Sequence, residues 1–360
     1  MKFILNGLRV SLGKESGLTA DMVAKEINLP QQAVRGIKVL RESVDARKKM
    51  PLAFVYSLEL EISASERQIE RALRNPNLKK VKISEQTPLQ RGDTPLRNRP
   101  VVIGTGPAGY FAALTLAKYG YAPLVLERGA DVDARTELVK SFWQGGELDV
   151  NCNVQFGEGG AGTFSDGKLT TRINDARITS VLNTFVESGA AEEILYKHKP
   201  HVGTDKLRSV VKNLRRQIES YGGEVRFRAQ VTGLKVENGR VAGVVVNESE
   251  EVPADIVVLA IGHSARDTYI MLQGLGVQLE AKSFAIGLRV EHPQSVINEA
   301  QFGEYADDPR LGAADYQFAY QDRETGRGAY AFCMCPGGKV VAATSEKGQV
   351  VTNGMSEFAR

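Results

Sequence analysis

Residues 101–129 read VVIGTGPAGYFAALTLAKYGYAPLVLERG, and this stretch decides the fold class. The run Val101–Ile103 is short and β-branched, which is typical of a strand that is buried on both faces. A Gly-x-Gly-x-x-Gly pattern follows at positions 104–109. A helical pattern comes next and ends at Gly120. Strand, glycine-rich loop and helix in this order predict the first half of a Rossmann-type α/β unit.

The glycines and the acid that follows them predict a dinucleotide site. Gly104 is expected to permit a tight turn, Gly106 to let the backbone approach a pyrophosphate, and Gly109 to allow close packing of helix on strand. Residues 122–126 predict a second strand with Glu127 at its carboxyl end. A carboxylate in that place can accept hydrogen bonds from both ribose hydroxyls of an adenosine, while the helix N-terminus stabilises the phosphates.

Two features favour FAD over NAD as the dinucleotide. Pro107 and Ala108 within the loop, and the sequence Glu127-Arg128-Gly129 after the second strand, are typical of FAD-binding loops. NAD-binding loops also occur with an acid at this place, so the loop alone leaves the choice open. A helix is expected over Asp131–Glu147, with Arg135 within reach of the pyrophosphate.

Composition describes an ordinary globular chain of 360 residues, with 42% hydrophobic and 25% charged residues, long enough for two or three domains. No apolar run approaches the length of a membrane span, and the N-terminus does not resemble a secretory signal. Three cysteines are too few for a disulfide framework. We therefore expect a cytoplasmic protein with no membrane partner.

Charge is distributed unevenly along the chain. Residues 1–100 hold 19 Lys/Arg and 11 Asp/Glu, a net charge of +8, whereas the remaining residues hold 27 and 32, a net charge of −5. A basic front module can bind nucleic acid or an acidic partner. A solvated charged face is the explanation that we favour, because these strands lack the aromatic residues of RNA-binding modules.

Residues 1–86 are expected to form a separate α+β module, followed by a linker at 87–99 that is rich in proline and polar residues. The expected order βαββαβ is typical of a ferredoxin-like fold. The elements expected are strands at Phe3–Ser11, Ala33–Leu40, Leu52–Ile62 and Leu78–Ile83, and helices at Ala20–Ile27 and Glu66–Arg74. The polar segment 43–49 (SVDARKK) connects two strands; it is either an anion or partner contact or, as we favour slightly, a solvated hairpin.

Residues 157–168 contain two formal motifs that we reject. Residues 157–162 repeat the Gly-x-Gly-x-x-Gly spacing, but no helical pattern follows them. Residues 162–168 spell G-x-x-x-x-G-K, but Leu169 stands where a Ser or Thr should bind magnesium. The glycines still leave backbone N–H groups free to line an anion or an aromatic ring at close approach.

The rest of the expected FAD-binding domain, 100–262, combines helices with a β-meander. Helices are expected at Ile178–Ser188 and Thr204–Tyr221, and strands at Glu224–Phe227, Val231–Glu237, Val241–Asn247 and Ala254–Gly262. Asn238-Gly239 predicts a two-residue hairpin turn. Residues 263–360 are expected to form a β-rich cap or substrate domain. Its expected strands are Ser283–Glu291, Tyr316–Tyr320, Tyr330–Cys335 and Lys339–Thr344.

No clear catalytic constellation is visible. Cys333 and Cys335 lie on one face of an expected strand, either as a thiol pair near a flavin or, as we favour, as small buried hydrophobic residues. Arg289, Glu291 and His292 are candidates for binding an acidic substrate or donating a proton, and an ion pair at a strand end explains them equally well. We expect no metal site, because His198 and His201 lack a further ligand at suitable spacing.

The chain resembles the bacterial FAD-dependent dehydrogenases that carry an N-terminal ferredoxin-like module. The segments that carry the resemblance are 43–49, 101–129, 157–172 (GEGGAGTFSDGKLTTR), 257–268 (VVLAIGHSARDT), 284–293 (FAIGLRVEHP) and 332–356 (FCMCPGGKVVAATSEKGQVVTNGMS). The resemblance implies a glutathione-reductase-like FAD-binding domain with non-covalent FAD. The residues expected to bind the cofactor are Gly104, Gly106, Pro107, Ala108, Gly109, Glu127, Arg128, Arg135, Gly160, Ala161, Gly162, Thr163, Val231, Ala260 and Gly262.

One departure from that architecture bears on the cofactor. Such flavoproteins usually hold the flavin end of FAD with a later Gly-Asp segment and helix, and no such segment precedes Arg360. We therefore expect the sequence to be a fragment, and expect residues 1–360 to bind FAD more weakly than a longer chain.

Two classes of function follow from the sequence. The first is an FAD-dependent oxidoreductase that acts on a small molecule, with NAD(P)H as a transient electron donor if a nicotinamide reduces the flavin. The second is a flavin-carrying binding protein whose basic N-terminal module docks RNA or a protein. We favour the enzyme and expect no nucleic-acid partner; the sequence leaves the substrate and the oligomeric state open.

Overall fold

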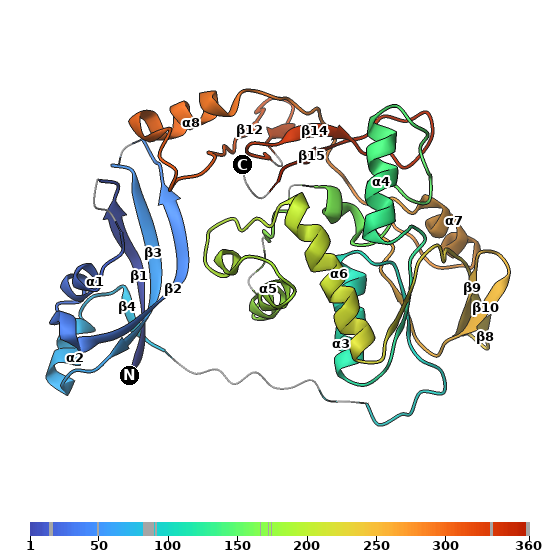
Figure 1. The fold of residues 1–360 in the computed structure, drawn as a ribbon, viewed down its shortest axis with the longest axis horizontal. Helices are drawn as coiled ribbons and strands as arrows, with labels where there is room; N and C mark the ends of the chain where they lie inside the picture. The colour runs from blue at the N-terminus through green and yellow to red at the C-terminus, as the bar shows by residue number, and fades with distance from the viewer. Residues whose placement is uncertain are drawn as a thin grey trace.

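A computed structural model describes residues 1–13, 17–48, 50–81, 90, 92–165, 167–171, 173, 175–331 and 334–357. Figure 1 shows three regions: an N-terminal sheet with two helices, a central sheet flanked by longer helices, and a C-terminal stretch that reaches from one to the other. The candidate site lies in the central region, so its sheet is described first.

The central sheet is four-stranded and parallel. Its strands are β5 (Val101–Ile103), β6 (Leu124–Leu126), β7 (Glu224–Arg226) and β11 (Val257–Leu259), in the order β11-β5-β6-β7. All three pairs are parallel, and Val101 of β5 lies opposite Leu124 on one side and Val257 on the other. This confirms the α/β fold with a parallel sheet that the Val101–Ile103 run and the glycine loop predict.

The two faces of the central sheet are covered differently. Successive strand residues point to opposite faces, so Val102 and Val125 pack against helices, whereas Val101 and Ile103 pack against a second, antiparallel sheet. The helices of this region are α3 (Pro107–Lys118), α4 (Val132–Trp143), α5 (Arg177–Glu187) and α6 (Thr204–Ser220), with 3₁₀ turns η2 (Gly160–Phe164) and η3 (Glu192–Leu195). Figure 1 shows α3 and α6 side by side.

The antiparallel sheet is a meander. It consists of β8 (Val231–Glu237), β9 (Arg240–Val246) and β10 (Glu250–Pro253), in the order β10-β9-β8. The predicted turn at Asn238-Gly239 is confirmed, because both residues have positive φ angles of 52° and 74°. The sequence analysis omits β10, whose side chains are mostly exposed and show no apolar alternation.

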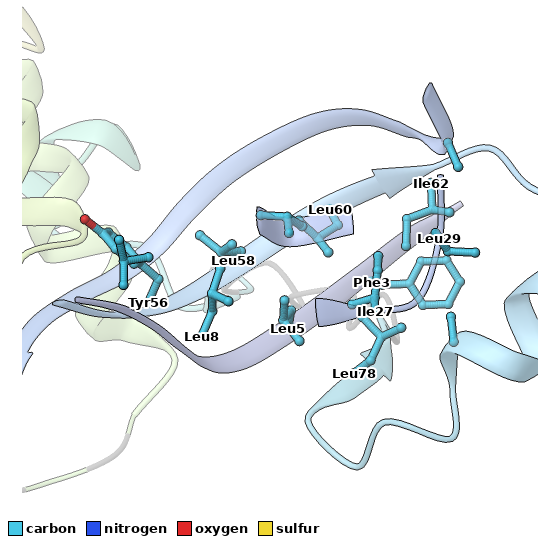
Figure 2. Close-up of a cluster of buried hydrophobic side chains, with 14 of the residues drawn as sticks. Phe3, Leu5, Leu8, Ile27, Leu29, Tyr56, Leu58, Leu60, Ile62 and Leu78 are labelled. Carbon is cyan, nitrogen blue, oxygen red and sulfur yellow. The ribbon is translucent and has the colours of Figure 1, made fainter. Parts of the chain in front are cut away.

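The N-terminal region forms a four-stranded sheet in which every pairing is antiparallel. Its elements are β1 (Lys2–Ser11), α1 (Ala20–Glu26), η1 (Gln31–Ala33), β2 (Val34–Asp45), β3 (Ala53–Ile62), α2 (Glu66–Ala72) and β4 (Leu78–Lys80), with the strand order β2-β3-β1-β4. Figure 2 shows the core of this region, a cluster of buried side chains that includes Leu5, Leu58 and Leu60 from the strands and Ile27, which follows α1.

The strand β2 extends further than expected. It pairs with β3 as far as Asp45 opposite Ala53, so residues 43–45 belong to a strand and not to the connection between strands. The hairpin loop is correspondingly short and begins at Ala46. Of the expected linker, residues 87–89 and 91 lie outside the described residues, and 92–99 contain neither helix nor strand.

The C-terminal region differs most from expectation, because it is not predominantly β. It contains α7 (Arg266–Gly274), α8 (Gln294–Phe302), η4 (Gly303–Tyr305), and the two-stranded pairs β12 (Ala319–Gln321) with β13 (Gly328–Tyr330) and β14 (Lys339–Ala342) with β15 (Thr352–Met355). The helices escape sequence analysis because α8 buries no residue and α7 buries only two, so neither carries a clear apolar stripe.

The strand expected at Ser283–Glu291 is wrong. None of the described strands pairs with this segment, and its alternating apolar side chains at Phe284, Ile286, Leu288 and Val290 are 71–96% exposed. Period-two alternation predicts a strand only where a partner completes the hydrogen-bond ladder and covers one face. The expected strands Tyr316–Tyr320 and Tyr330–Cys335 are displaced to β12 and β13.

The packing role expected for Gly109 leads to a test of the fold. A Cβ atom at residue 109 would lie 1.9 Å from the carbonyl oxygen of Gly104, at the point where α3 leaves the sheet. We predict that Gly109→Ala lowers the free energy of unfolding by about 1–3 kcal/mol, because the first turn of α3 must move away from β5.

Urea unfolding followed by circular dichroism measures this change. Gly106→Ala is the matched control, since the atom nearest to its Cβ, the Cα of Gly160, is 3.9 Å away. Equal unfolding free energies for the two variants would contradict the packing role of Gly109.

Candidate functional site

A cavity of about 440 Å³ lies at the carboxyl ends of β5, β6 and β11. Its walls come from the loop 104–108, the turn 160–162 and the segment 259–265, which are far apart in sequence. In open α/β sheets, ligands bind beyond the carboxyl ends of the strands. The cavity therefore lies where the sequence analysis expects a dinucleotide.

Glycines bring these walls closer together than other residues would allow. Gly104 has a φ of +101°, and a Cβ there would lie 2.5 Å from the carbonyl oxygen of Ala260. Gly160 has a φ of +64°, and its Cβ would lie 2.9 Å from the Cα of Gly106. Both positions combine a left-handed backbone with direct contact between main chains, so a side chain would separate the walls.

Two other glycines face open space. Gly106 and Gly162 line the cavity, and a Cβ at Gly106 would meet no atom closer than 3.9 Å, while one at Gly162 would meet none within 4 Å. Gly106 is also the N-cap of α3, with Pro107 as the first helical residue. The positive end of the helix dipole and its unpaired N–H groups are therefore directed at the cavity.

Glu127 is buried and accepts four hydrogen bonds. Its Oε2 accepts from the backbone N–H of Thr105 at 2.9 Å and from the Thr105 hydroxyl at 2.7 Å. Its Oε1 accepts from the N–H groups of Gly129 at 2.9 Å and Gly157 at 3.0 Å. A carboxylate offers about four acceptor positions, so this side chain joins the glycine loop to the segment at Gly157.

Arg135 has a different role from the expected contact with a pyrophosphate. Its side chain is fully buried, does not line the cavity, and donates to the carbonyl groups of residues 153, 154, 157, 158 and 160 at 2.6–3.2 Å. Burial lowers its pKa to about 10. The guanidinium thus supports the 153–160 loop from behind, because all three of its nitrogen atoms donate to that loop's backbone.

A second buried carboxylate supports the same loop. Glu158 is fully buried and accepts from the Tyr110 hydroxyl at 2.8 Å, from Nε of Arg215 at 2.9 Å and from the N–H of Val132 at 2.7 Å. Burial, with the nearby Glu158 charge, raises the pKa of Tyr110 well above its usual value. This network leaves no local pattern in the sequence, since its members come from α3, α4, α6 and the turn that contains Glu158.

The remaining expected cofactor residues divide into two groups. Those that line the cavity are Pro107, Ala108, Arg128, Ala161, Val231, Ala260 and Gly262. Gly109 and Thr163 do not line it: Gly109 packs under the loop, and the Thr163 hydroxyl donates to the Glu158 carbonyl at 3.2 Å. Lining residues that sequence analysis misses include Gln155, His263, Ser264 and Tyr269.

Arg128 is held at the cavity wall by two neighbours. Its guanidinium lies 4.5 Å from the ring centroid of Phe156 and forms an ion pair with Asp267 of α7. Its side chain is only 12% exposed. Asp267 offsets the charge of Arg128, and the pair fixes the place of its guanidinium N–H donors at the wall.

The expected catalytic candidates lie outside this cavity. Arg289 donates to the Thr352 carbonyl at 3.0 Å, Glu291 accepts from the N–H of Val340 at 2.6 Å, and His292 contacts the Tyr316 hydroxyl at 3.0 Å. Cys335 lies beside Gly354, and Cys333 lies outside the described residues. Arg289 and Glu291 thus hold the 283–293 segment on β14 and β15 instead of pairing with each other.

The described residues contain no group of three or more His, Cys, Asp or Glu side chains placed to hold a metal ion. In the same part of the chain, no helix combines the length and the apolar character that crossing a membrane requires.

The four hydrogen bonds of Glu127 lead to a test of its structural role. We predict that Glu127→Gln lowers the free energy of unfolding by about 1–3 kcal/mol without any ligand, because an amide NH₂ then faces backbone N–H donors. Chemical unfolding of the ligand-free protein measures the change. Glu137→Gln, a change at an exposed position on α4, is the control. If Glu127→Gln has the same unfolding free energy as wild type, Glu127 does not stabilise the fold.

Comparison with known proteins identifies three segments. Residues 98–290 match the pyridine nucleotide-disulphide oxidoreductase family, and residues 283–360 match the FAD-dependent protein, C-terminal domain-like family. Residues 5–61 match a domain of unknown function, DUF8436.

Relatives of known sequence extend beyond this chain. An uncharacterized protein of Clostridium beijerinckii is 46% identical over 360 residues, which is all of this chain and 67% of that protein. The digeranylgeranylglycerophospholipid reductase of Haloferax volcanii is 28% identical over 240 residues, 66% of this chain and 50% of that protein. Protein FixC of Salmonella typhi is 28% identical over 55% of this chain and 44% of its own length.

Solved structures are more distant. Thermovibrio ammonificans THI4 covers 50% of this chain and 64% of its own at 18% identity, with a TM-score of 0.33. Lactococcus lactis thioredoxin reductase covers 46% of this chain and 36% of its own at 16% identity, with a TM-score of 0.26. Scores this low say nothing about function.

The family match spans more than half of the chain and contains the parallel sheet, the glycine loop and the cavity. The Clostridium relative matches over the full length of the chain. The chain therefore belongs to the pyridine nucleotide-disulphide oxidoreductase family, a family of FAD-dependent oxidoreductases.

Proposed function

We propose that the cavity at residues 104–108 and 160–162 binds the ADP half of FAD, and that the protein is an oxidoreductase acting on a small molecule. The observation that carries this proposal is the meeting of two glycine segments at the N-terminus of α3, beyond the carboxyl ends of parallel strands. Such a place suits a pyrophosphate, because backbone N–H groups and the helix dipole both favour negative charge.

The free space at Gly106 and Gly162 supports the fit of a dinucleotide. Both residues leave room on the cavity side, where a larger side chain would occupy the volume of the ligand. Arg128 is fixed at the same wall by Phe156 and Asp267. In this proposal the backbone of the two glycine segments holds the pyrophosphate, and the guanidinium of Arg128 adds N–H donors, with its charge offset by Asp267.

Glu127 is proposed to hold the ribose, with one condition set by its hydrogen bonds. Its acceptor positions are occupied, so a ribose hydroxyl must replace an existing donor. The Thr105 hydroxyl is the donor best able to leave, because a side-chain torsion can turn it away while the backbone N–H bonds persist. Glu127 would then both shape the loop and orient the ligand.

FAD supplies the redox chemistry when it is bound, and the protein supplies position, charge and exclusion of water. The family places this chain among FAD-dependent oxidoreductases. NAD(P)H as a transient electron donor remains a prediction. A small-molecule substrate, a cytoplasmic location and the lack of a nucleic-acid partner remain predictions as well.

We further infer a division into a ferredoxin-like module at 1–86, a linker at 87–99, an FAD-binding domain at 100–262 and a cap or substrate domain at 263–360. The antiparallel order β2-β3-β1-β4 supports the first assignment, since a βαββαβ unit gives this arrangement. Contacts of the C-terminal region with the site support the last: Gln155 donates to the carbonyl of Ala343, just after β14, at 3.0 Å, and Asp267 of α7 pairs with Arg128.

The proposal predicts a variant that folds but loses flavin. In Gly106→Val the new side chain points into the cavity, where we place the pyrophosphate. We expect the purified variant to be colourless, with flavin absorbance at least about tenfold below wild type, because the lost charge-assisted hydrogen bonds are worth about 1.5–3 kcal/mol each.

The absorbance spectrum and the thermal unfolding midpoint of the ligand-free protein are measured together. Gly274→Val, at the end of α7 and away from the cavity, controls for the cost of a valine. A folded Gly106→Val variant that keeps its full flavin absorbance would rule out the proposed pyrophosphate site.

A further inference from the structure

A second and larger cavity, of about 960 Å³, lies between the N-terminal region and the rest of the chain. Its walls are the end of β2 with residues 46–48, the segment 193–201 that follows α5, and the segment 309–315 that follows α8. Among the described residues, none lines both this cleft and the glycine-walled cavity. It is thus a separate feature of the molecule.

Main-chain hydrogen bonds fix the two walls of the cleft to each other. The N–H of Glu42 donates to the Tyr196 carbonyl at 2.8 Å, and the N–H of His198 donates to the Glu42 carbonyl at 2.7 Å. Glu42 and Lys197 form a parallel bridge, so the edge strand β2 continues its pairing into the other region. Clefts at domain interfaces with preformed walls are preferred places for small ligands.

The cleft has an excess of positive charge. Of its described lining side chains, seven are Lys or Arg and four are Asp or Glu. Three of the cations lie on the last part of β2 and its loop: Arg41, Arg47 and Lys48. From its sequence, the segment 43–49 is expected to be a solvated hairpin. Its residues 43–48 instead form part of the cavity wall.

Several of these cations are neutralised and others are not. Asp45 accepts from Arg47 at 2.7 Å and also pairs with Arg9, and these two arginines, Arg47 first, lower the pKa of its carboxyl. Lys197 pairs with Glu193, and Lys199 with Asp315.

Arg41 and Lys48 differ from those paired cations. Arg41 donates to Nδ1 of His198 at 3.0 Å rather than to a carboxylate. Within the described part of the chain, no ion pair is formed by Lys48. Burial lowers the pKa of His198 most, and the charges of Arg41 and Lys199 lower it further.

We propose that this cleft binds a small polyanion, a molecule with two or more phosphate or carboxylate groups. The volume admits a ligand of nucleotide size, and Arg41 and Lys48, which lie at different places along the β2 wall, can each form charge-assisted hydrogen bonds to anionic oxygens. The cleft is bounded by three segments from two regions of the chain. A nucleic acid instead needs a basic stripe that is open along its length, so a small molecule fits this geometry better.

The test uses the full chain and two probes, inorganic pyrophosphate and citrate. Binding of each probe is measured by isothermal titration calorimetry at about 0.15 M salt, where exposed charges more than about 8 Å apart are largely screened but direct contacts persist. The cleft variant is Arg41→Gln combined with Lys48→Gln. The matched control is Arg67→Gln with Lys79→Gln, which removes one arginine and one lysine from α2 and β4, and β4 is at the opposite edge of the same sheet from β2.

We expect saturable binding of at least one probe by wild type. The cleft variant should weaken it about tenfold or more through loss of charge-assisted hydrogen bonds, and the control by less than about twofold. The probe should also raise the thermal unfolding midpoint of wild type but not that of the cleft variant. Each protein is compared with itself without the probe, so a lower stability of the variant does not affect the result. Flavin absorbance should be unchanged, which separates this site from the proposed FAD site.

Three results would overturn the proposal. The first is an absence of saturable binding of either probe to wild type. The second is equal weakening in the cleft variant and the control, which would reduce binding to net charge. The third is binding of a short single-stranded RNA, lost in the cleft variant, with no binding of either small probe.

Discussion

Two buried charged side chains, Glu127 and Arg135, hold the two glycine segments of the cavity in contact. Glu127 joins the loop at Thr105 to the backbone of Gly157, and Arg135 gathers the carbonyls of residues 153–160. Removing one partner of a buried polar pair leaves the other without hydrogen bonds, and this lowers the free energy of unfolding strongly. The intact pair itself adds little stability compared with apolar side chains of similar size. The shape of the cavity therefore depends on one lining residue, Glu127, and on one residue behind the wall, Arg135.

The glycines matter because of this arrangement. Gly160 approaches Gly106, and Gly129 approaches Gly157, at distances that leave no room for a Cβ atom. Main chain lying against main chain brings backbone N–H and C=O groups to this part of the cavity wall. Such a wall suits a phosphate group, and it links the parallel sheet to the proposed recognition of FAD.

The sequence predicts the parallel sheet and the glycine loop because both depend on local order along the chain. Val101–Ile103, the glycine spacing and Glu127 are close in sequence, and their geometry follows from strand, turn and helix rules. The roles of Arg135 and Glu158 depend on the path of the 153–163 loop, which no periodicity describes. A long-range contact such as that between Tyr110 and Glu158 leaves no mark on either local pattern.

In the C-terminal region, by contrast, a clear local pattern predicts a strand that the structure does not contain. The alternation in Phe284–Val290 is a genuine strand pattern, but a strand also needs a neighbour, and none of the described strands pairs with these residues. The helices α7 and α8 bury few side chains, so their helical period is weak. An apolar pattern predicts a buried strand or helix correctly only where another element packs against it. Expectation and structure therefore agree best at the centre of the parallel sheet, where both faces are covered.

The central claim is that the cavity recognises the ADP half of FAD, and competition among FAD, FMN and ADP tests it most directly. The flavin-free full chain is titrated with FAD while flavin fluorescence is followed, and the titration is repeated with FMN and with FAD in the presence of ADP. Because the proposed contacts lie on the pyrophosphate and the adenosine, we expect FAD to bind, ADP to compete with it, and FMN, which lacks that half, to bind far more weakly. FMN binding as tight as that of FAD, or a failure of ADP to compete, would contradict the assignment of this cavity.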